Sequence, residues 1–432
     1  MIGAGYLGLT HAVCMAELGH DVLVADVDAS RIALAAGGVP PFFEPGLEPL
    51  LRKNLEAGRL RFTTDHGEAA RFGDVHFLCV GTPQARDGSA DLAQVHAAAD
   101  ALAPHLAGPC VIAGKSTVPV GTGRALARRI AELAPPGAGG RWRGTPEFLR
   151  EGTAVQDSLL PDRIVLGVTS QRSEQMLRRV YARQAARGVP VLVMDVQSAE
   201  LVKVSANAFL AARLSFINVL AEVCEATGAD VTALAGALAG DGRIGGRFLA
   251  PGLGYGGGCL PKDVRAFAAA AGQLGIESLA VLLGEVDAIN LRCRTRTVSL
   301  ARDAAGGSLD GCRAAVLGVA FKPGSDDVRD SASLEVCCRL AAEGAHVTVH
   351  DPVAAASAAR LRPDLRYAAS AVEAAASADL VLHLTEWPEY GLIDPDVLGA
   401  VVARRSIIDA RCVLDEQRWR SAGWSFRVLG RP

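Results

Sequence analysis

The stretch Gly3-Ala4-Gly5-Tyr6-Leu7-Gly8 decides the fold of the first part of this chain. It is a G-x-G-x-x-G pattern, and residues 6–18 after it are predicted to form a helix. Its glycines permit a tight turn, close approach of a pyrophosphate and tight helix–strand packing, with the pyrophosphate at the helix N-terminus. We interpret Gly3, Gly5, Tyr6, Leu7 and Gly8 as a dinucleotide site, and the alternative is a glycine-rich turn without a ligand.

An acidic residue follows the pattern at the expected spacing. Asp26 ends the next predicted strand, about 20 residues after the glycines. A carboxylate there accepts a hydrogen bond from a ribose 2′-hydroxyl and repels a 2′-phosphate. The sequence therefore predicts NAD rather than NADP as the cofactor.

The strand that normally precedes such a glycine loop is short in this sequence. Only Met1 and Ile2 stand before Gly3, whereas a strand usually takes about five to six residues. We expect the first strand to be nearly absent.

The rest of the chain alternates between strand-like and helix-like segments. Short β-branched runs at 22–26, 75–80 and 111–113 lie between helical stretches at 6–18, 47–55 and 92–106, which indicates a parallel sheet covered on both faces. Residues 199–227 are predicted to form one long helix, followed by more helix over 263–303 with a break near Gly275. Strands at 313–319, 346–350, 380–384 and 406–409 repeat the α/β pattern.

These patterns predict an α/β protein with two doubly wound Rossmann-like domains joined by a long central helix. The predicted domains are a cofactor domain at 1–198, a helical dimerisation domain at 199–303 and a second Rossmann-like domain at 304–432. On periodicity alone, the long helix is equally compatible with simple burial between domains.

Composition excludes several other classes of protein. The 432 residues carry 44 Lys+Arg and 47 Asp+Glu, a net charge of -3, which argues against an electrostatic nucleic-acid binder. A hydrophobic fraction of 50% with 21% charge excludes long disorder. No uncharged apolar run reaches the ~18 residues of a membrane helix, and no signal peptide precedes Gly3. We expect a cytoplasmic protein without a membrane partner.

None of the ten cysteines forms a CxxC pair, and no cluster has metal-ligand spacing.

One cysteine lies in an unusual setting. The stretch from Gly252 to Asp263 reads GLGYGGGCLPKD, so Cys259 follows a glycine-rich loop and precedes Lys262 and Asp263. Glycines leave room for a substrate, and a nearby cation favours a nucleophilic thiolate. We interpret Cys259 as a catalytic nucleophile, since the alternative of a buried structural thiol fits poorly with so many glycines.

The chain as a whole resembles a known family. The matching stretches occur in order along almost its full length: 3–9, 43–47, 81–83, 115–122, 146–152, 161–165, 203–211, 243–245, 254–263, 321–322, 326–329 and 409–411. They resemble the UDP-glucose/GDP-mannose dehydrogenase family, and the segments 115–121 and 243–245 resemble its UDP-glucose branch. The resemblance implies a four-electron oxidation of a hexose C6 alcohol to a carboxylate by two NAD, with a C-terminal domain that binds the nucleotide of the sugar nucleotide.

The same resemblance implies roles for individual residues. The catalytic set comprises Cys259, Lys203, Asn207, Asp263, Glu147 and Thr117. Further cofactor contacts are Arg31, Thr82, Thr117, Glu151, Lys262 and Arg329. Sugar-nucleotide contacts are Glu147, Phe148, Leu149, Arg150, Glu151, Lys203, Asn207, Arg243, Tyr255, Gly256, Lys322 and Arg411. Arg243 and Arg329 are expected to act across a homodimer.

Three alternatives stay open at the level of sequence. UDP-glucose is the expected substrate, but the segment 260–265 also resembles the GDP-mannose branch, and a UDP-N-acetylhexosamine is a further alternative. An inactive nucleotide-binding paralogue is the alternative from another class. Cys259, Lys203, Asn207 and Asp263 argue against it, because a non-catalytic chain has no chemical use for this set.

Overall fold

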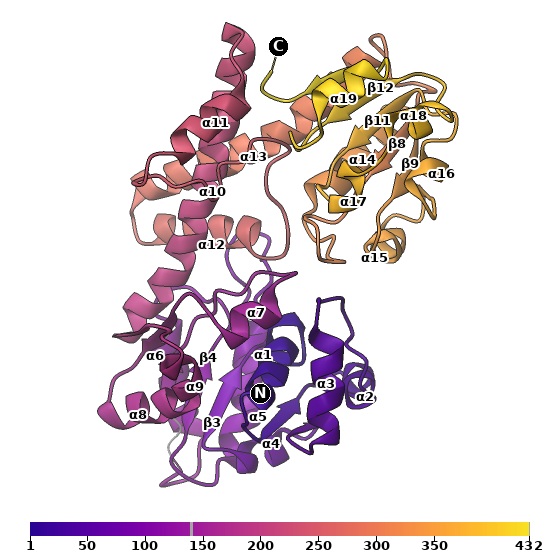
Figure 1. Ribbon diagram of the computed structural model, residues 1–432. Helices are drawn as coiled ribbons and strands as arrows, with labels where there is room; N and C mark the ends of the chain where they lie inside the picture. The colour runs from indigo at the N-terminus through magenta and orange to yellow at the C-terminus, as the bar shows by residue number, and fades with distance from the viewer. Residues whose placement is uncertain (139–140, 432) are drawn as a thin grey trace. The chain divides into compact units, whose positions relative to one another are not determined.

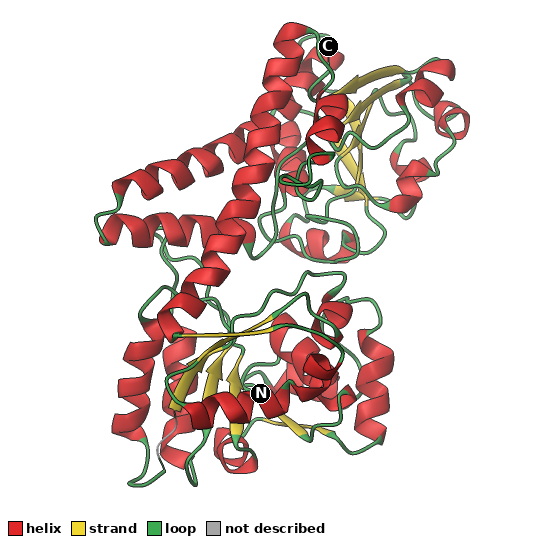
Figure 2. Ribbon diagram, turned by 60° about the vertical axis from the view of Figure 1, so that its left-hand side comes forward, coloured by secondary structure: helices red, strands yellow, loops and turns green. Residues whose placement is uncertain are grey.

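The computed structural model describes residues 1–138 and 141–431, so the last residue of the third predicted domain, residue 432, lies outside it. The chain forms two compact units, residues 1–206 and 207–432 (Figure 1). Each unit contains a sheet with helices packed around it (Figure 2). The predicted α/β class with two Rossmann-like sheets and a long central helix is confirmed.

The first unit has mainly parallel strands in two adjoining groups. Strands β1 (Val22–Ala25) and β2 (Leu60–Thr63) form one pair. The other group has the order β3-β4-β5-β6-β7, with β3 at Val75–Leu78 and β4 at Val111–Gly114. The remaining strands are β5 (Arg141–Gly144), β6 (Ile164–Gly167) and β7 (Val191–Met194), and only the β5–β6 pairing is antiparallel.

The segment from Met1 to Gly3 joins the two groups of strands through backbone hydrogen bonds. Ile2 makes isolated parallel bridges with Ala25 at the end of β1 and with Leu78 in β3. Its backbone N–H donates to Phe77 and its carbonyl accepts from Cys79, both at 2.8 Å. The expectation of a nearly absent first strand is confirmed, and Ile2 occupies the position between β1 and β3 that this strand would fill.

Helices connect these strands on both sides. They are α1 (Tyr6–Glu17), α2 (Ala29–Ala36), α3 (Leu47–Glu56), α4 (His66–Phe72), α5 (Ala93–Leu102), the 3-10 turn η1 (Ala103–His105), α6 (Thr122–Leu133), α7 (Ala154–Leu159), α8 (Gln171–Val180) and α9 (Ala182–Ala186).

The second unit contains a six-stranded, fully parallel sheet in the order β10-β9-β8-β11-β12-β13. Numbered from β8, this is the order 3-2-1-4-5-6 of a Rossmann sheet. The strands are β8 (Arg313–Leu317), β9 (His346–His350), β10 (Arg366–Tyr367), β11 (Leu380–His383), β12 (Ser406–Asp409) and β13 (Ser425–Val428). Its helices are α14 (Ala332–Ala342), α15 (Ala355–Leu361), α16 (Ala371–Ala374), α17 (Pro388–Gly391), α18 (Pro395–Gly399) and α19 (Glu416–Ser421).

Four further helices form the middle of the chain. They are α10 (Val196–Thr227), α11 (Val231–Ala239), α12 (Leu260–Gln273) and α13 (Glu277–Ala304). The predicted break near Gly275 lies in the turn between α12 and α13, where Gly275 has a φ of 73°. By length and composition α10 could cross a membrane, but the core helix of a soluble protein meets the same test. Its polar residues Glu200, Lys203 and Asn207 are buried in the protein.

Candidate active site

The glycine loop of the first unit has the geometry that a dinucleotide needs. A Cβ on Gly3 would lie 2.9 Å from the carbonyl oxygen of Cys79, and one on Gly8 would lie 2.0 Å from that of Gly3. A Cβ on Gly5 would meet no described atom within 4 Å. Gly3 and Gly8 therefore permit tight packing, whereas Gly5 leaves open space at the start of α1. No described side chain caps that helix, so its first amides can bind a phosphate.

Asp26 connects this loop to the end of β1. Its buried carboxylate accepts hydrogen bonds from the N–H of Ala4 at 2.6 Å and of Asp28 at 2.9 Å. The guanidinium of Arg31 lies 3.3 Å from the same carboxylate. The structure thus brings together the predicted ribose-binding acid and the predicted basic residue beside it. This set of residues fits the adenosine half of NAD.

The Tyr6 side chain makes a contact that the sequence did not predict. Its hydroxyl donates a short hydrogen bond to Glu44. Burial is the main cause that raises the pKa of Tyr6, and this hydrogen bond is the second. The Glu44 carboxylate also accepts from the N–H of Gly152 and of Ala154, each at 2.7 Å. Glu44 therefore ties the dinucleotide helix to the segment that carries Glu147 and Glu151.

Two predicted catalytic residues of the first unit form a buried ion pair. The Lys203 ammonium lies 3.3 Å from Glu147, and the two side chains are only 6% and 10% exposed. The other Glu147 oxygen accepts from the N–H of Leu149 at 2.6 Å. The Phe148 ring lies under two cations, with Arg163 at 4.0 Å and Lys203 at 5.5 Å from its centroid. These contacts fix the carboxylate and the ammonium relative to each other.

In the second unit, Cys259 is exposed and occupies the N-cap position of α12. One turn later, the buried Asp263 carboxylate accepts from the Asn207 amide at 2.7 Å and from the Lys262 ammonium at 2.6 Å. A thiol at a helix N-terminus lies in a positive field that favours the thiolate. The structure thus gathers four of the predicted residues around one helix start.

The glycine loop before Cys259 is packed against the C-terminal sheet. The N–H of Leu253 donates to the carbonyl of Ala410 at 2.9 Å. Arg411 donates to the carbonyl of Gly254 at 3.2 Å and to that of Leu384 at 2.6 Å. Arg411, a predicted sugar-nucleotide contact, therefore lies beside the loop that carries the nucleophile.

The remaining predicted residues lie outside these groups. Some are at the surface with local partners, and others are buried. Arg243 pairs with Asp241, and its side chain is 90% exposed. Arg329 pairs in the same way with Asp327, and Arg150 pairs with Asp157. Lys322 lies over the ring of Phe321 at 5.4 Å. Thr82 is buried and Thr117 and Glu151 are half-buried in loops of the first unit. Tyr255 and Gly256 are buried in the second unit.

Comparison with protein families assigns the chain along most of its length. Residues 1–185 match the UDP-glucose/GDP-mannose dehydrogenase family, NAD binding domain. Residues 197–292 match the central domain of the same family, and residues 315–416 match its UDP binding domain. The chain belongs to the UDP-glucose/GDP-mannose dehydrogenase family. This confirms the resemblance drawn from the motifs, and it confirms NAD as the cofactor.

Individual relatives of this dehydrogenase family match from end to end. A UDP-glucose 6-dehydrogenase of Rhizobium meliloti is 40% identical over 435 residues, covering 100% of this chain and 99% of the relative. One of Haloferax volcanii is 40% identical over 422 residues, covering 96% of each chain. A solved UDP-glucose dehydrogenase structure from Pyrobaculum islandicum has a TM-score of 0.91 at 37% identity, covering 100% of this chain and 97% of that one.

Several residues that shape this dehydrogenase site were not predicted to do so. Glu44 and Lys115 stand in stretches quoted for the resemblance, yet neither was assigned a role. Glu200 accepts from the N–H groups of Gly121 and Gly123, both at 2.7 Å, and thereby caps α6. Burial raises the pKa of Glu200 against these two hydrogen bonds. The sequence shows Glu200 only as an acidic residue in a predicted helix, and this does not identify the N–H groups that it caps.

Proposed function

We propose that the chain oxidises UDP-glucose at C6 to UDP-glucuronate, using NAD and a covalent Cys259 intermediate. The observation that carries this proposal is the exposed Cys259 thiol at the start of α12, one turn from the buried Asp263, Lys262 and Asn207 group. UDP-glucose is supported as substrate by full-length relatives of that name at 40% identity. The family's UDP binding domain, matched at residues 315–416, supports a uridine nucleotide.

The first oxidation converts the C6 alcohol to an aldehyde. NAD, held by the glycine loop at Gly3–Gly8 and by Asp26, would supply the hydride acceptor for this oxidation and for the second. The alcohol proton leaves as the hydride departs, so negative charge develops on the C6 oxygen. Lys203 supplies a cation for this charge, and Asn207 offers its remaining amide N–H because Asp263 already holds the first one. Removing such a donor lowers the rate by about 10²–10³, which we expect for Lys203→Ala.

The covalent phase is carried by Cys259. Its thiolate adds to the aldehyde carbon to give a thiohemiacetal, which loses the second hydride to become a thioester. Water then breaks the C–S bond, releasing the carboxylate product and the thiol. Glu147 is the proposed base for this water, with Thr117 in the same network, and the Leu149 N–H and the Lys203 ammonium hold its carboxylate in place.

A homodimer and a cytoplasmic location are also part of this proposal. The dimer is supported by exposed apolar residues along α10, including Phe209 at 65% and Phe216 at 58% exposure. Arg243 and Arg329 are proposed to reach the partner's site. The cytoplasmic location is supported by the ten cysteines, which are all free thiols and suit a reducing compartment.

The decisive experiment counts NADH released per molecule of UDP-glucose, with GDP-mannose and a UDP-N-acetylhexosamine as alternative substrates. We expect about two NADH per UDP-glucose and little oxidation of the others. Cys259→Ala should abolish complete turnover while leaving UDP-glucose binding largely intact, and Cys338→Ala, a partly buried thiol, is the control. Two NADH from Cys259→Ala would contradict the nucleophile assignment.

A second measurement separates the roles within the covalent phase. Glu147→Gln keeps the shape of the side chain but removes the base, so the thioester should accumulate on Cys259. Intact mass spectrometry after incubation with UDP-glucose and NAD should show the added nucleotide sugar. An unmodified Glu147→Gln protein with normal turnover would exclude Glu147 as the base.

A further inference from the structure

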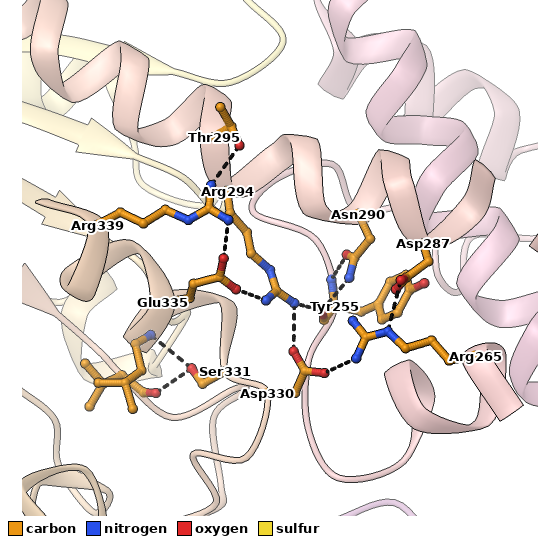
Figure 3. Close-up of polar contacts among 12 residues, drawn as sticks. Tyr255, Arg265, Asp287, Asn290, Arg294, Thr295, Asp330, Ser331, Glu335 and Arg339 are labelled. Carbon is orange, nitrogen blue, oxygen red and sulfur yellow. Dashed lines mark hydrogen bonds and ion pairs between the residues drawn. The ribbon is translucent and has the colours of Figure 1, made fainter. Parts of the chain in front are cut away.

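A buried arginine outside the predicted site holds the loop that presents Cys259. Arg294 projects from α13, and its side chain is 2% exposed (Figure 3). It donates to Asp330 at 3.2 Å, to the carbonyl of Tyr255 at 3.3 Å and, in a short contact, to Glu335 on α14. The Arg294 guanidinium therefore connects three parts of the chain: the loop before Cys259, Asp330, and helix α14 of the C-terminal Rossmann-like domain.

The Tyr255 peptide is held from a second direction by the same helix. The Asn290 side chain accepts from the N–H of Tyr255 at 2.7 Å and donates to its carbonyl at 3.0 Å (Figure 3). Asn290 and Arg294 are one turn apart on α13, so both reach the same peptide. Tyr255 precedes Cys259 by four residues. The backbone of Tyr255 is thus held by two side chains of α13, which fixes the start of the segment that leads to Cys259.

The glycines that follow Tyr255 pack closely against the backbone of Arg329 and Asp330. A Cβ on Gly256 would lie 2.4 Å from the carbonyl oxygen of Asp330. The N–H of Gly257 donates to the carbonyl of Arg329 at 3.1 Å. The loop between Tyr255 and Cys259 therefore takes its shape from the backbone of Arg329 and Asp330.

Asp330 is itself fixed by two arginines. Its φ of 45° lies in the left-handed region, which an Asp adopts at some cost. One carboxylate oxygen accepts from Arg294, and the other accepts at 3.0 Å from Arg265, which also binds Asp287 at 2.9 Å. Arg294 contacts both Asp330 and the carbonyl of Tyr255, the two supports of the loop.

We propose that Arg294 is a positioning residue for Cys259: by joining the Tyr255 carbonyl to Asp330, it fixes the glycine loop so that the thiol meets the C6 aldehyde as it forms. This rests on the proposed covalent mechanism. The first oxidation does not use the thiol, whereas capture of the aldehyde depends on where the thiol lies. Loosening the loop should therefore let free aldehyde escape before the second hydride transfer.

The test is the yield of NADH per UDP-glucose consumed, measured at limiting UDP-glucose with semicarbazide present to trap free aldehyde. The wild-type protein should give two NADH and no adduct. Arg294→Gln should give between one and two NADH and a semicarbazone of the sugar nucleotide detected by mass spectrometry. Arg294→Lys, which keeps the charge but cannot hold three partners at once, should lie between them.

The matched control is Arg302→Gln, two turns later on α13, which removes an exposed pair with Glu343 and should keep a yield of two. A merely structural role for Arg294 would lower the melting temperature and the rate but leave the yield at two without adduct, and that result would overturn the proposal. If Arg294→Gln does not fold, the yield of Arg294→Lys decides in the same way. Failure of the proposed function is distinct, because the wild-type protein would then not give two NADH.

Discussion

At the residue scale, Asp26 combines an observed contact with the glycine loop and a predicted role in cofactor choice. It accepts from the N–H of Ala4 inside the glycine loop and lies 3.3 Å from Arg31. We predict that Asp26→Ser narrows the preference for NAD over NADP, because it removes a ribose acceptor and the repulsion of a 2′-phosphate. Values of kcat/KM for the two cofactors measure this directly.

The control for this substitution is Asp28→Asn. Asp28 is a nearby acidic residue that caps α2 through the N–H groups of Ser30 and Arg31. Asn retains a capping oxygen, so this variant removes a neighbouring charge without changing the helix start. An equal change in cofactor preference for both variants would mean that general charge, and not a contact of Asp26 with the ribose, sets the preference.

Lys115 gives a prediction on stability. It is buried with its ammonium 5.9 Å from the ring centroid of Tyr181, and burial lowers the pKa of Lys115 below its ordinary value. The unfolded chain then binds a proton that the folded protein has released, so this group makes the free energy of unfolding rise with pH up to the ordinary lysine range. The wild-type protein should gain stability relative to Lys115→Met as the pH rises from about 8 to 10.

Urea unfolding of both proteins across this range gives the difference, in which titrations common to the two cancel. Lys53→Met, at an exposed ion pair with Glu17, is the control for loss of a lysine. A constant difference between wild type and Lys115→Met would show that Lys115 keeps its proton throughout.

Residues with predicted chemical roles lie beside one another in the structure, whereas the groups that hold them could not be predicted from the sequence. Lys203, Glu147, Asn207 and Asp263 were assigned from motifs, and the structure pairs them as Lys203 with Glu147 and Asn207 with Asp263. The role of Arg294 was invisible, because its three partners come from segments up to 41 residues away. Periodicity reports that a helix face is buried and cannot report which distant carboxylate meets it.

At the scale of elements, Ile2 lies between β1 and β3 and forms a bridge with each. It is 1% exposed, and its own backbone N–H and carbonyl bond the β3 side, while the neighbouring Met1 carbonyl and Gly3 N–H bond Ala25 of β1. Ile2→Ala should lower the free energy of unfolding by about 2–5 kcal/mol, as for other buried aliphatic truncations, and should weaken NAD binding because Gly3 follows directly. Denaturant unfolding and NAD titration measure the two effects.

The comparison variant is Val39→Ala, a surface aliphatic that is 44% exposed and should change stability by no more than about 0.5 kcal/mol. An equally small effect of Ile2→Ala would mean that the backbone bonds alone join the two groups of strands. The sequence predicted a very short strand here, but it could not show which residues of β1 and β3 the segment 1–3 pairs with.

Other elements show where sequence patterns stop being informative. The strands over 22–26, 75–80 and 111–113 were predicted and correspond to β1, β3 and β4. Strand β5 could not be predicted from composition, since Arg141–Gly144 reads RWRG and contains no β-branched residue. Its strand conformation comes from pairing with β4 along four residues, which is a tertiary effect.

At the scale of the whole molecule, α10 presents an apolar stripe. Leu201, Phe209, Phe216 and Val223 are 40%, 65%, 58% and 49% exposed. Spacings of eight, seven and seven residues at about 100° per residue place them within about 80° of one another around the helix. Exposed aromatic residues in such a stripe are typical of a surface that another chain covers. The sequence predicted the long helix but could not separate this surface from simple burial.

We predict that the wild-type protein sediments as the proposed dimer and that the double variant Phe209→Glu/Phe216→Glu is a monomer at the same concentration. Two carboxylates in an apolar interface cannot be desolvated without partners, so the charge opposes association and not folding. Sedimentation equilibrium measures the mass, and circular dichroism establishes that the helices remain. Leu392→Glu, at a residue 80% exposed in the C-terminal sheet domain, is the control and should stay dimeric.

If Arg243 acts in the partner's site, the monomer should also lose affinity for UDP-glucose. A folded double variant with wild-type mass would show that another surface forms the dimer.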